Sequence, residues 1–369
     1  HTDIWNGDKL NMEFLSIFFE TANMGIVVAL FVVGLIFIIK GGDWFVDSAS
    51  WIAEVLGVPK FIIGATIVSL ATTLPEMIVS IVATADGKVD MASGNAVGSV
   101  TANTAMIMGI FIVCMPFAVK RKEFAPKGLM MLGAAVALTL GSALTGLIKV
   151  PGLEGEYHTL STVGMIALFA IFIAFFIENF VSMKKSSVQI EPDPHGIGLQ
   201  EEDDVVPSKG TATGKEWAKN IVLFVVGAIC IVVGAQLLIN GGTRIAKEMH
   251  ISERVIGVIA VAIGTSLPEL VTTITALRKK EGALSVGNIL GANIIDLALI
   301  LPICSFVSMG KGQGALVVST GSVFDMIICV VAVSIAVIPT LFTKKLQRWQ
   351  GIVSLTGYLA YVVYTFVAA

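Results

Sequence analysis

The sequence has little charge and few side chains that bind transition metals. Charged residues make up only 14% of its 369 positions, and it has only four histidines and four cysteines. A soluble domain is roughly a quarter charged, so the composition excludes an ordinary soluble protein. The cysteines lie in apolar segments without metal-ligand spacing, which indicates small core side chains and not a metal or redox site. The net charge of −3, without a long basic stretch, gives no reason to expect nucleic acid as a partner.

Long apolar runs take up most of the chain. Hydrophobic residues account for 55% of the positions, and the mean hydropathy is +0.88. Several runs reach about 20 residues, the length that a helix needs to cross a bilayer. We therefore predict an all-α membrane protein surrounded by the lipid bilayer. Its ten transmembrane helices are expected at 24–39, 61–85, 91–117, 128–148, 159–182, 218–239, 255–277, 283–308, 320–342 and 351–369.

Lysine and arginine are distributed unequally between the two sides of this arrangement. The ten spans leave the Lys and Arg residues in loops or, for Lys219, at the start of a span, 7 of the 24 on the side of the N-terminus and 17 on the other. Basic residues favour the cytoplasmic face, so we expect a multi-pass protein of the inner (plasma) membrane with both termini outside. The longest loop, 183–217, would then be cytoplasmic. Its prolines and the acidic run at 201–204 are typical of a disordered linker, with calcium sensing as an alternative.

The two halves of the chain are related by an internal repeat. A shift of 193 residues aligns 32–98 with 225–291 without a gap, and 20 of the 67 aligned positions are identical. Five spans, an odd number, separate the copies, so the second copy must enter the membrane from the opposite side. Inverted repeats of this kind are typical of secondary transporters, whose substrate site lies where the repeats meet. We predict two inverted five-helix repeats, 24–182 and 218–369, joined by the acidic linker 183–217.

A polar stripe runs along the second span of each repeat. Its members recur at intervals of three and four residues, which places them on one face of a helix. In the first repeat they are Ser69, Thr72, Thr73, Glu76 and Ser80, and in the second Thr265, Ser266, Glu269, Thr272 and Thr273. A proline, Pro75 or Pro268, precedes each glutamate and removes a helical hydrogen bond. We therefore expect a broken helix with carbonyls near Ala71 and Gly264 free to bind cations.

The third span of each repeat carries a second polar line. Its residues are four apart, Asn95, Ser99 and Asn103 in the first repeat and Asn288, Ala292 and Asp296 in the second. Glycine pairs at 94 and 98 and at 287 and 291 predict that these helices approach their neighbours closely. Asn95 and Asn288 suit interhelical hydrogen bonds as well as they suit ion binding.

Three acidic residues fall in the middle of predicted spans, namely Glu76, Glu269 and Asp296. An ionised group at mid-bilayer costs at least about 2.5–3.5 kcal/mol, so three together make sense chiefly if a cation compensates them. All the candidate ligands are oxygens, which hard cations such as Ca²⁺ and Na⁺ prefer. The pattern therefore indicates a site for hard cations and not for transition metals.

Two short segments resemble a known family. Ala71–Glu76 and Gly264–Glu269, each followed by a glycine–asparagine motif, are similar to the two α-repeats of the cation/calcium exchanger superfamily. The Thr-Ser-Leu-Pro-Glu sequence at 265–269 resembles sodium/calcium exchangers, whereas the proton/calcium branch typically has Gly-Asn-x-x-Glu there. The usual Gly-Ser-Asn is Gly98-Ser99-Val100 in the first repeat and Gly291-Ala292-Asn293 in the second. Each repeat therefore lacks one polar group of the pattern.

The resemblance implies four cation sites around the two glutamates, one for Ca²⁺ and the others for Na⁺. The implied Ca²⁺ ligands are Glu76, Glu269, Thr72 and Thr265. The groups implied for Na⁺ are the side chains of Ser69, Thr73, Ser99 and Ser266 and the backbone carbonyl of Ala262. Asn103 and Asp296 would occupy the centre. Because three carboxylates leave one excess negative charge around a single Ca²⁺, Asp296 is expected to bind Na⁺ or to carry a proton when Ca²⁺ is bound.

Together these observations predict a secondary active antiporter, not an enzyme, that exports Ca²⁺ in exchange for Na⁺ by alternating access. No cofactor is expected besides the transported ions, and the chain is expected to function as a monomer. Two alternatives that use the same carboxylates stay open. One is a Ca²⁺/H⁺ antiporter. The other is a K⁺-dependent Na⁺/Ca²⁺ exchanger, because an aspartate at position 296 resembles that branch of the superfamily. A channel and an intramembrane hydrolase are weaker alternatives, the latter because the polar stripes contain no His or Cys.

Overall fold

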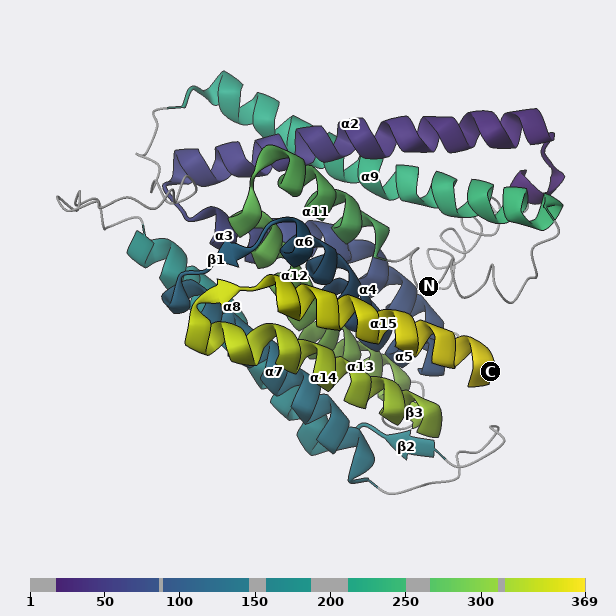
Figure 1. Cartoon of the computed structure of the whole chain (residues 1–369), viewed down its shortest axis with the longest axis vertical. Coiled ribbons are helices and arrows are strands. Elements are labelled where there is room, and N and C mark those ends of the chain that lie inside the picture. The colour runs from purple at the N-terminus through teal and green to yellow at the C-terminus, as the bar shows by residue number, and fades with distance from the viewer. Residues whose placement is uncertain are drawn as a thin grey trace.

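The computed structural model describes residues 18–85, 89–145, 157–186, 212–249, 266–310 and 316–368. Apart from four strands of two or three residues, the regular elements in these ranges are helices (Figure 1). Eight described helical segments are long and apolar enough to cross a membrane. They are Met24–Leu56, Lys60–Ala85, Ala92–Cys114, Arg121–Ala143, Thr162–Lys184, Gly214–Ile245, Gly282–Gly310 and Ser322–Thr343. The all-helical class is thus confirmed.

Three of these eight segments consist of several joined helices, and the other five are single helices. In the first half they are α2 (Met24–Leu56), α3 (Lys60–Ile63), η1 (Gly64–Val68), α4 (Ser69–Ala85), α5 (Val89–Thr101), η2 (Ala102–Ile107), α6 (Met108–Cys114), α7 (Arg121–Ala143) and α8 (Thr162–Ser186). In the second half they are α9 (Gly214–Glu248), α11 (Leu267–Lys279), α12 (Gly282–Ile295), η3 (Asp296–Ile300), α13 (Leu301–Gly310), α14 (Thr320–Thr343) and α15 (Arg348–Ala368). The described helices α11 and α15 overlap the predicted seventh and tenth spans; residues 255–265 of the seventh lie outside the described ranges.

The label η marks π-helical turns, whose hydrogen bonds span five residues instead of four. Shifting η2 by 193 residues places it on 295–300, which covers η3 and one residue before it. The third span of each half therefore widens at the same point. Sequence patterns did not predict these turns, since a π turn has no distinct hydrophobic period. They are frequent at functional sites.

The first span is much longer than its apolar run. We predicted 24–39, but α2 has 33 residues, which is about 50 Å at 1.5 Å per residue. The prediction stopped before Lys40 because charged residues begin there. The helix continues as an amphipathic segment with Phe45 buried, and it ends at Gly57, whose φ of 62° provides a left-handed cap.

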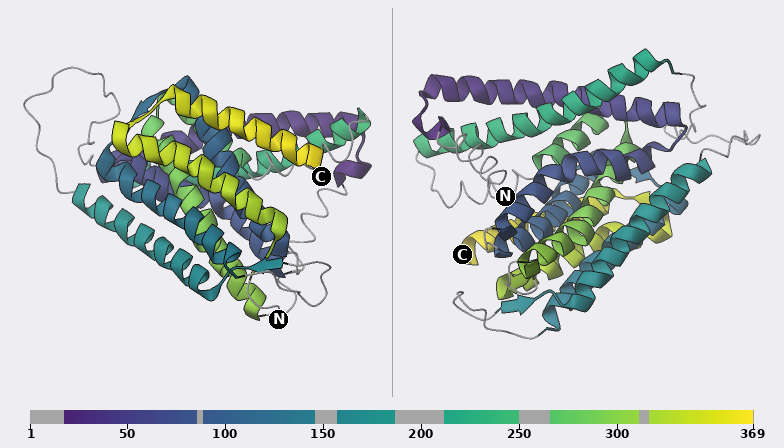
Figure 2. Two further views of the ribbon diagram at one scale, coloured as in Figure 1. Left: turned by 60° about the horizontal axis from the view of Figure 1, so that its bottom comes forward. Right: turned by 180° about the vertical axis from the view of Figure 1, so that it is seen from behind.

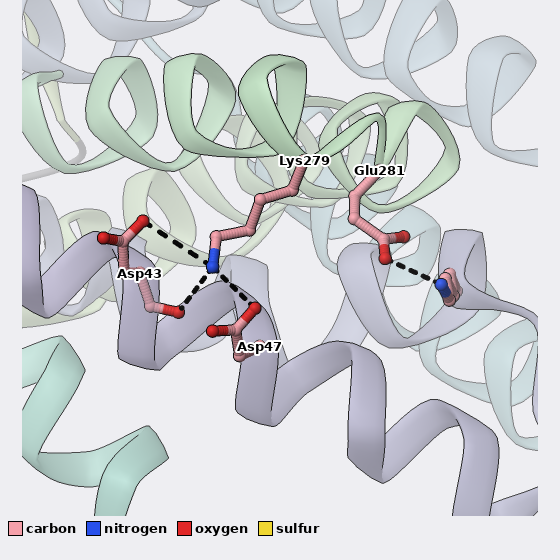
Figure 3. Close-up of polar contacts among 5 residues, drawn as sticks. Asp43, Asp47, Lys279 and Glu281 are labelled. Carbon is pink, nitrogen blue, oxygen red and sulfur yellow. Dashed lines mark hydrogen bonds and ion pairs between the residues drawn. The ribbon is translucent and has the colours of Figure 1, made fainter.

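Ion pairs tie this amphipathic part of α2 to the second half of the chain (Figure 3). Lys279, at the end of α11, places its Nζ 2.6 Å from Asp47 Oδ1 and 3.6 Å from Asp43 Oδ1 on α2. Beside it, Glu281 pairs with Lys60 at 2.7 Å. Charged residues beyond the end of the predicted span therefore join α2 to α11, and the pair of Lys60 with Glu281 joins α3 to the start of α12.

A buried lysine corrects the assignment of basic residues to loops. The predicted fourth span was 128–148, but α7 begins at Arg121, so Lys127 lies inside the helix and is fully buried. Its Nζ is 2.6 Å from Glu178 Oε2 on α8 and 5.6 Å from the centre of the Phe61 ring. An ion pair of this kind compensates a buried charge, which the count of basic residues could not anticipate.

The predicted linker 183–217 overlaps helices at both of its ends. α8 extends to Ser186, and α9 begins at Gly214 after a capping box formed by Thr213 and Glu216. The residues between 187 and 211, including the acidic run, lie outside the described ranges.

The long helices α2 and α9 run antiparallel and side by side along one edge of the protein, and Figure 2 shows them adjacent from two further directions. Two glycine contacts bring their backbones together. A Cβ added to Gly34 would lie 3.0 Å from the carbonyl oxygen of Gly234, and one added to Gly41 would lie 2.9 Å from that of Gly227. Small residues allow such close approach between membrane helices.

At the centre of the protein, α12 packs against α3, η1 and α4. Glycines make this contact possible. A Cβ at Gly287 would collide with the carbonyl oxygen of Phe61, and one at Gly291 would lie 2.5 Å from Ser69 Oγ and 2.6 Å from the carbonyl oxygen of Ala65. The close approach predicted from the glycine spacing is therefore present in the second half of the chain. In the first half, nothing among the described residues lies within 4 Å of a Cβ at Gly94 or Gly98.

Two short antiparallel strand pairs connect the halves of the chain. β1 (Phe117–Ala118), between α6 and α7, pairs with β4 (Lys345–Leu346), between α14 and α15. β2 (Tyr157–Thr159), between α7 and α8, pairs with β3 (Val317–Ser319), between α13 and α14. Each pair thus joins a connection of one half to a connection of the other.

Candidate ion-binding site

Three acidic side chains meet in the core. Glu76 lies on α4, Glu269 in the first turn of α11 and Asp296 at the first residue of η3, and each is only 1% exposed. The carboxyl groups of Glu269 and Asp296 are both close enough to Glu76 to interact with it electrostatically. The structure therefore brings together the three carboxylates that the sequence singled out.

Several oxygens of these carboxylates are unsatisfied. Both carboxylate oxygens of Glu76, Oε2 of Glu269 and Oδ1 of Asp296 are buried and have no hydrogen-bond partner among the described residues. Buried polar groups normally have a partner, so such a cluster needs an explanation. Cations or protons are the groups that would satisfy acceptor oxygens of like charge.

Several hydroxyl groups are buried on α4, the helix that carries Glu76, and one of them contacts a carboxylate of the other half. Thr72 Oγ1 donates to Asn288 Oδ1 on α12 at 3.3 Å, and it also interacts with the carboxylate of Glu269. Ser69 and Thr73 are buried on the same helix, where Thr73 Oγ1 donates to the Ser69 carbonyl at 2.7 Å. Thr72 therefore links the stripe of the first half to both polar helices of the second.

The remaining predicted ligands are placed as follows. Ser99 on α5 and Asn103 on η2 are buried. Ser266, which precedes α11, is buried, and its Oγ has no hydrogen-bond partner within the described part of the chain. Thr265 and Ala262 lie outside the described residues, so their predicted roles stay predictions.

The prolines do not break the first polar helix as expected. α4 continues through Pro75, and the irregular turn is η1, which ends immediately before Ser69. In the second half, α11 begins at Leu267, so Pro268 occupies its first turn, where the missing N–H costs no helical hydrogen bond. Glu269 therefore sits at a helix N-terminus, whereas Glu76 sits in the middle of a helix.

Asn103 is held by Asn293, a residue outside the predicted set of ligands. Its Nδ2 donates to Asn293 Oδ1 at 3.1 Å, and the Nδ2 of Asn293 lies 2.8 Å from Thr104 Oγ1 and 3.3 Å from Met131 Sδ. The family pattern drew attention to Asn293, but no local signal pointed to Thr104 on η2 or Met131 on α7.

The acidic residues do not form a site by themselves. In the described ranges, no group of three or more His, Cys, Asp or Glu side chains converges on a single metal position. Ca²⁺ takes six to eight oxygen ligands, so a cation here would also need hydroxyl and carbonyl oxygens. The buried hydroxyls beside Glu76 and Glu269 are suitable groups.

Comparison with known proteins identifies the class. A family profile described as "Sodium/calcium exchanger protein" matches residues 26–178 and again residues 219–367. The two matches begin 193 residues apart, the same shift as the internal repeat. The chain belongs to this family of membrane antiporters that exchange cations for Ca²⁺.

Individual relatives agree. The chain is 29% identical over 358 residues to the sodium/calcium exchanger MaX1 of Methanosarcina acetivorans, covering 91% of this chain and 97% of that protein. It is 31% identical to the inner membrane protein YrbG of Escherichia coli, over 78% and 82% of the two chains. A solved structure of the sodium-calcium exchanger NCX_Mj has a TM-score of 0.72 at 27% identity, covering 92% of this chain and 99% of that one. The resemblance to sodium/calcium exchangers is thereby confirmed.

Proposed function

We propose that the protein is a secondary active antiporter that exports Ca²⁺ in exchange for Na⁺ by alternating access. The observation that carries this proposal is the cluster of Glu76, Glu269 and Asp296, which is buried between the two halves with four unsatisfied carboxylate oxygens. One Ca²⁺ or several Na⁺ can neutralise such a cluster, but both sets cannot occupy it fully. Competition between them couples the two fluxes.

Within this site we assign the ligands as the family resemblance implies. Ca²⁺ would bind the two glutamates with Thr72 and Thr265. Na⁺ would use the groups of Ser69, Thr73, Ser99 and Ser266, the carbonyl of Ala262, and Asp296 with Asn103 at the centre. The described contacts support this assignment for Thr72, because its hydroxyl lies between Asn288 and Glu269.

We further propose ten membrane helices in two inverted repeats. Under the 193-residue shift, Gly34 becomes Gly227 and Gly41 becomes Gly234, so the Gly34–Gly234 contact maps onto the Gly227–Gly41 contact. The strand pairs behave in the same way: β1 and β3 follow the third span of their halves, and β2 and β4 follow the fourth. A pseudo-two-fold axis in the membrane plane would produce both reciprocal patterns.

Orientation in the cell membrane, with both termini outside, rests on the distribution of basic residues, which stays unequal, at 16 to 7, when the buried Lys127 is left out. A cysteine introduced at Gly310 should react with an impermeant thiol reagent from outside, and one at Ser208 only from the cytoplasm. Matched single-cysteine variants in a cysteine-free background would show this in intact and permeabilised cells. The opposite labelling pattern would reverse the proposed direction of the repeats.

The coupling ion can be tested by ⁴⁵Ca²⁺ uptake into proteoliposomes that contain the purified protein. An outward Na⁺ gradient should drive uptake, and a proton gradient of equal size should not. Omitting K⁺ tests the K⁺-dependent alternative, which Asp296 favours because a K⁺ beside Ca²⁺ would balance its charge. Uptake that ignores Na⁺ and follows only the proton gradient would replace the Na⁺ proposal with a Ca²⁺/H⁺ antiporter.

A further inference from the structure

A chain of buried polar contacts leads from α7 to the centre of the candidate site. Met131 on α7 contacts Asn293 on α12, and Asn293 contacts Asn103 on η2. Thr104, the residue after Asn103, contacts Asn293 as well. All four side chains are buried. Packing of the core alone does not require these polar contacts, because apolar side chains would fill the same space without hydrogen bonds.

The chemistry of these groups determines which way each amide points. A thioether sulfur can only accept a hydrogen bond, so the nitrogen of Asn293 must face Met131 Sδ, 3.3 Å away. The oxygen of Asn293 then faces Asn103 and can only accept. Asn103 must therefore present its own nitrogen to Asn293, at 3.1 Å. Its carbonyl oxygen is left buried and without a hydrogen-bond partner in the described part of the chain.

We propose that Asn293 is a positioning residue that keeps the carbonyl oxygen of Asn103 available to a transported cation, with Met131 holding Asn293 in the required orientation. This inference rests on the proposed function, in which Asn103 and Asp296 form the centre of the site. A cation needs an oxygen ligand, so an Asn103 amide turned by 180° would present a repelling N–H₂ group instead. Unconstrained, an amide can adopt both orientations.

The same argument explains a difference between the repeats. The counterpart of Asn103 is Asp296, and the counterpart of Asn293 is Val100, which is buried and apolar. The two oxygens of a carboxylate are equivalent, so Asp296 offers an oxygen ligand in either orientation and needs no orienting partner. An amide does need one. Only the repeat that supplies an amide to the centre is therefore faced by an asparagine from the other repeat.

The test measures cation binding, and it does not depend on transport. The melting temperature of the purified protein in detergent is followed while Na⁺ and Ca²⁺ are titrated separately into cation-free buffer. Asn293→Leu should raise the apparent dissociation constant of at least one of these ions by about tenfold. Met131→Leu, which removes only the orienting sulfur, should raise it by about two- to fivefold. Val100→Ala, the matched control at the equivalent position, should leave both affinities unchanged.

A second set of variants, made in Asn103→Asp, distinguishes an effect on the orientation of the Asn103 amide from an effect on packing alone. In Asn103→Asp the side chain has two equivalent oxygens, so adding Asn293→Leu should weaken cation binding by less than about twofold. An equal loss in both backgrounds, or wild-type affinities in both Asn293→Leu and Met131→Leu, would overturn the inference. If Asn293→Leu does not fold, the cation affinities of Met131→Leu alone test the inference, because this substitution preserves the volume of the side chain. A wild-type protein that binds these cations but shows no Na⁺-driven flux would contradict the proposed function and leave this inference standing.

Discussion

Asn95 and Asn288 hold equivalent positions in the two repeats, yet they bond differently. Asn95 Nδ2 donates to Ser80 Oγ at 3.0 Å, within its own repeat. Asn288 Oδ1 accepts from Thr72 of the other repeat at 3.3 Å, and its Nδ2 has no partner in the described ranges. Thr273, the counterpart of Ser80, instead accepts from Ser285 at 3.2 Å. In the described ranges the amide of the second repeat therefore bonds across the interface between the halves, and that of the first repeat bonds within its own half; Thr265, the counterpart of Thr72, lies outside these ranges.

The glycines that follow the same pattern differ as well. Gly287 and Gly291 are in contact with the backbone of α3 and η1, whereas Gly94 and Gly98 have open space around a potential Cβ among the described residues. Residues 254–262, which the repeat would place beside Gly94 and Gly98, lie outside the described ranges. A repeated sequence specifies equivalent helices, but side chains that differ between the repeats, such as Asn293 and Val100, give the two copies different contacts. Substitutions at matched positions should therefore have unequal effects, except where both repeats supply the same charge.

The two glutamates are the exception, and they should give the largest effect. Glu76→Gln and Glu269→Gln should each reduce Ca²⁺ flux to the background of empty vesicles, because each removes one of the charges that compensate the ion. Both variants should remain folded, as judged by size-exclusion chromatography. Glu54→Gln, at an exposed position on α2, is the matched control and should retain wild-type flux. Near-normal exchange in either site variant would refute the site assignment.

The close glycine contacts of the second repeat come next. Gly287→Ala forces a Cβ against the Phe61 carbonyl, and overpacking of this kind typically costs about 1–3 kcal/mol. Its melting temperature should fall by several degrees, whereas Gly357→Ala, at an exposed position on α15, should melt within a degree or two of the wild type. Equal melting temperatures of the two variants, measured by thermal unfolding in detergent, would show that the contact of Gly287 with Phe61 is not tight.

The smallest effect is expected where the repeats differ in charge. Asp296→Asn makes the centre symmetric, because each repeat then supplies one amide there. It also removes one of the three carboxylates. It should leave Ca²⁺ binding largely intact, because two glutamates already balance one Ca²⁺. It should shift the Na⁺ affinity or stoichiometry and abolish any K⁺ dependence. Flux measured separately against Na⁺, K⁺ and pH checks this, and a complete loss of Ca²⁺ binding would place Asp296 among the essential Ca²⁺ ligands.

The sequence predicted the helical class, the approximate position of most spans and the three central carboxylates. These features follow from hydropathy and from the cost of burying charge. Helix ends were predicted less well, since α2 and α7 extend past charged residues that ion pairs stabilise, such as Lys127 with Glu178. The π turns and the Met131–Asn293–Asn103 contacts could not be predicted. They depend on three-dimensional packing between segments that are distant in the chain, and that packing leaves no periodic signal.

The central claim is that one set of carboxylates holds either one Ca²⁺ or several Na⁺. Equilibrium binding of ⁴⁵Ca²⁺ to the purified protein, measured while Na⁺ is raised at constant ionic strength and pH, tests it most directly. We predict that Na⁺ displaces Ca²⁺ completely, with a Hill coefficient above 1, and that Glu76→Gln binds no Ca²⁺ at all. Ca²⁺ binding that Na⁺ does not change, and that only protons displace, would contradict the account.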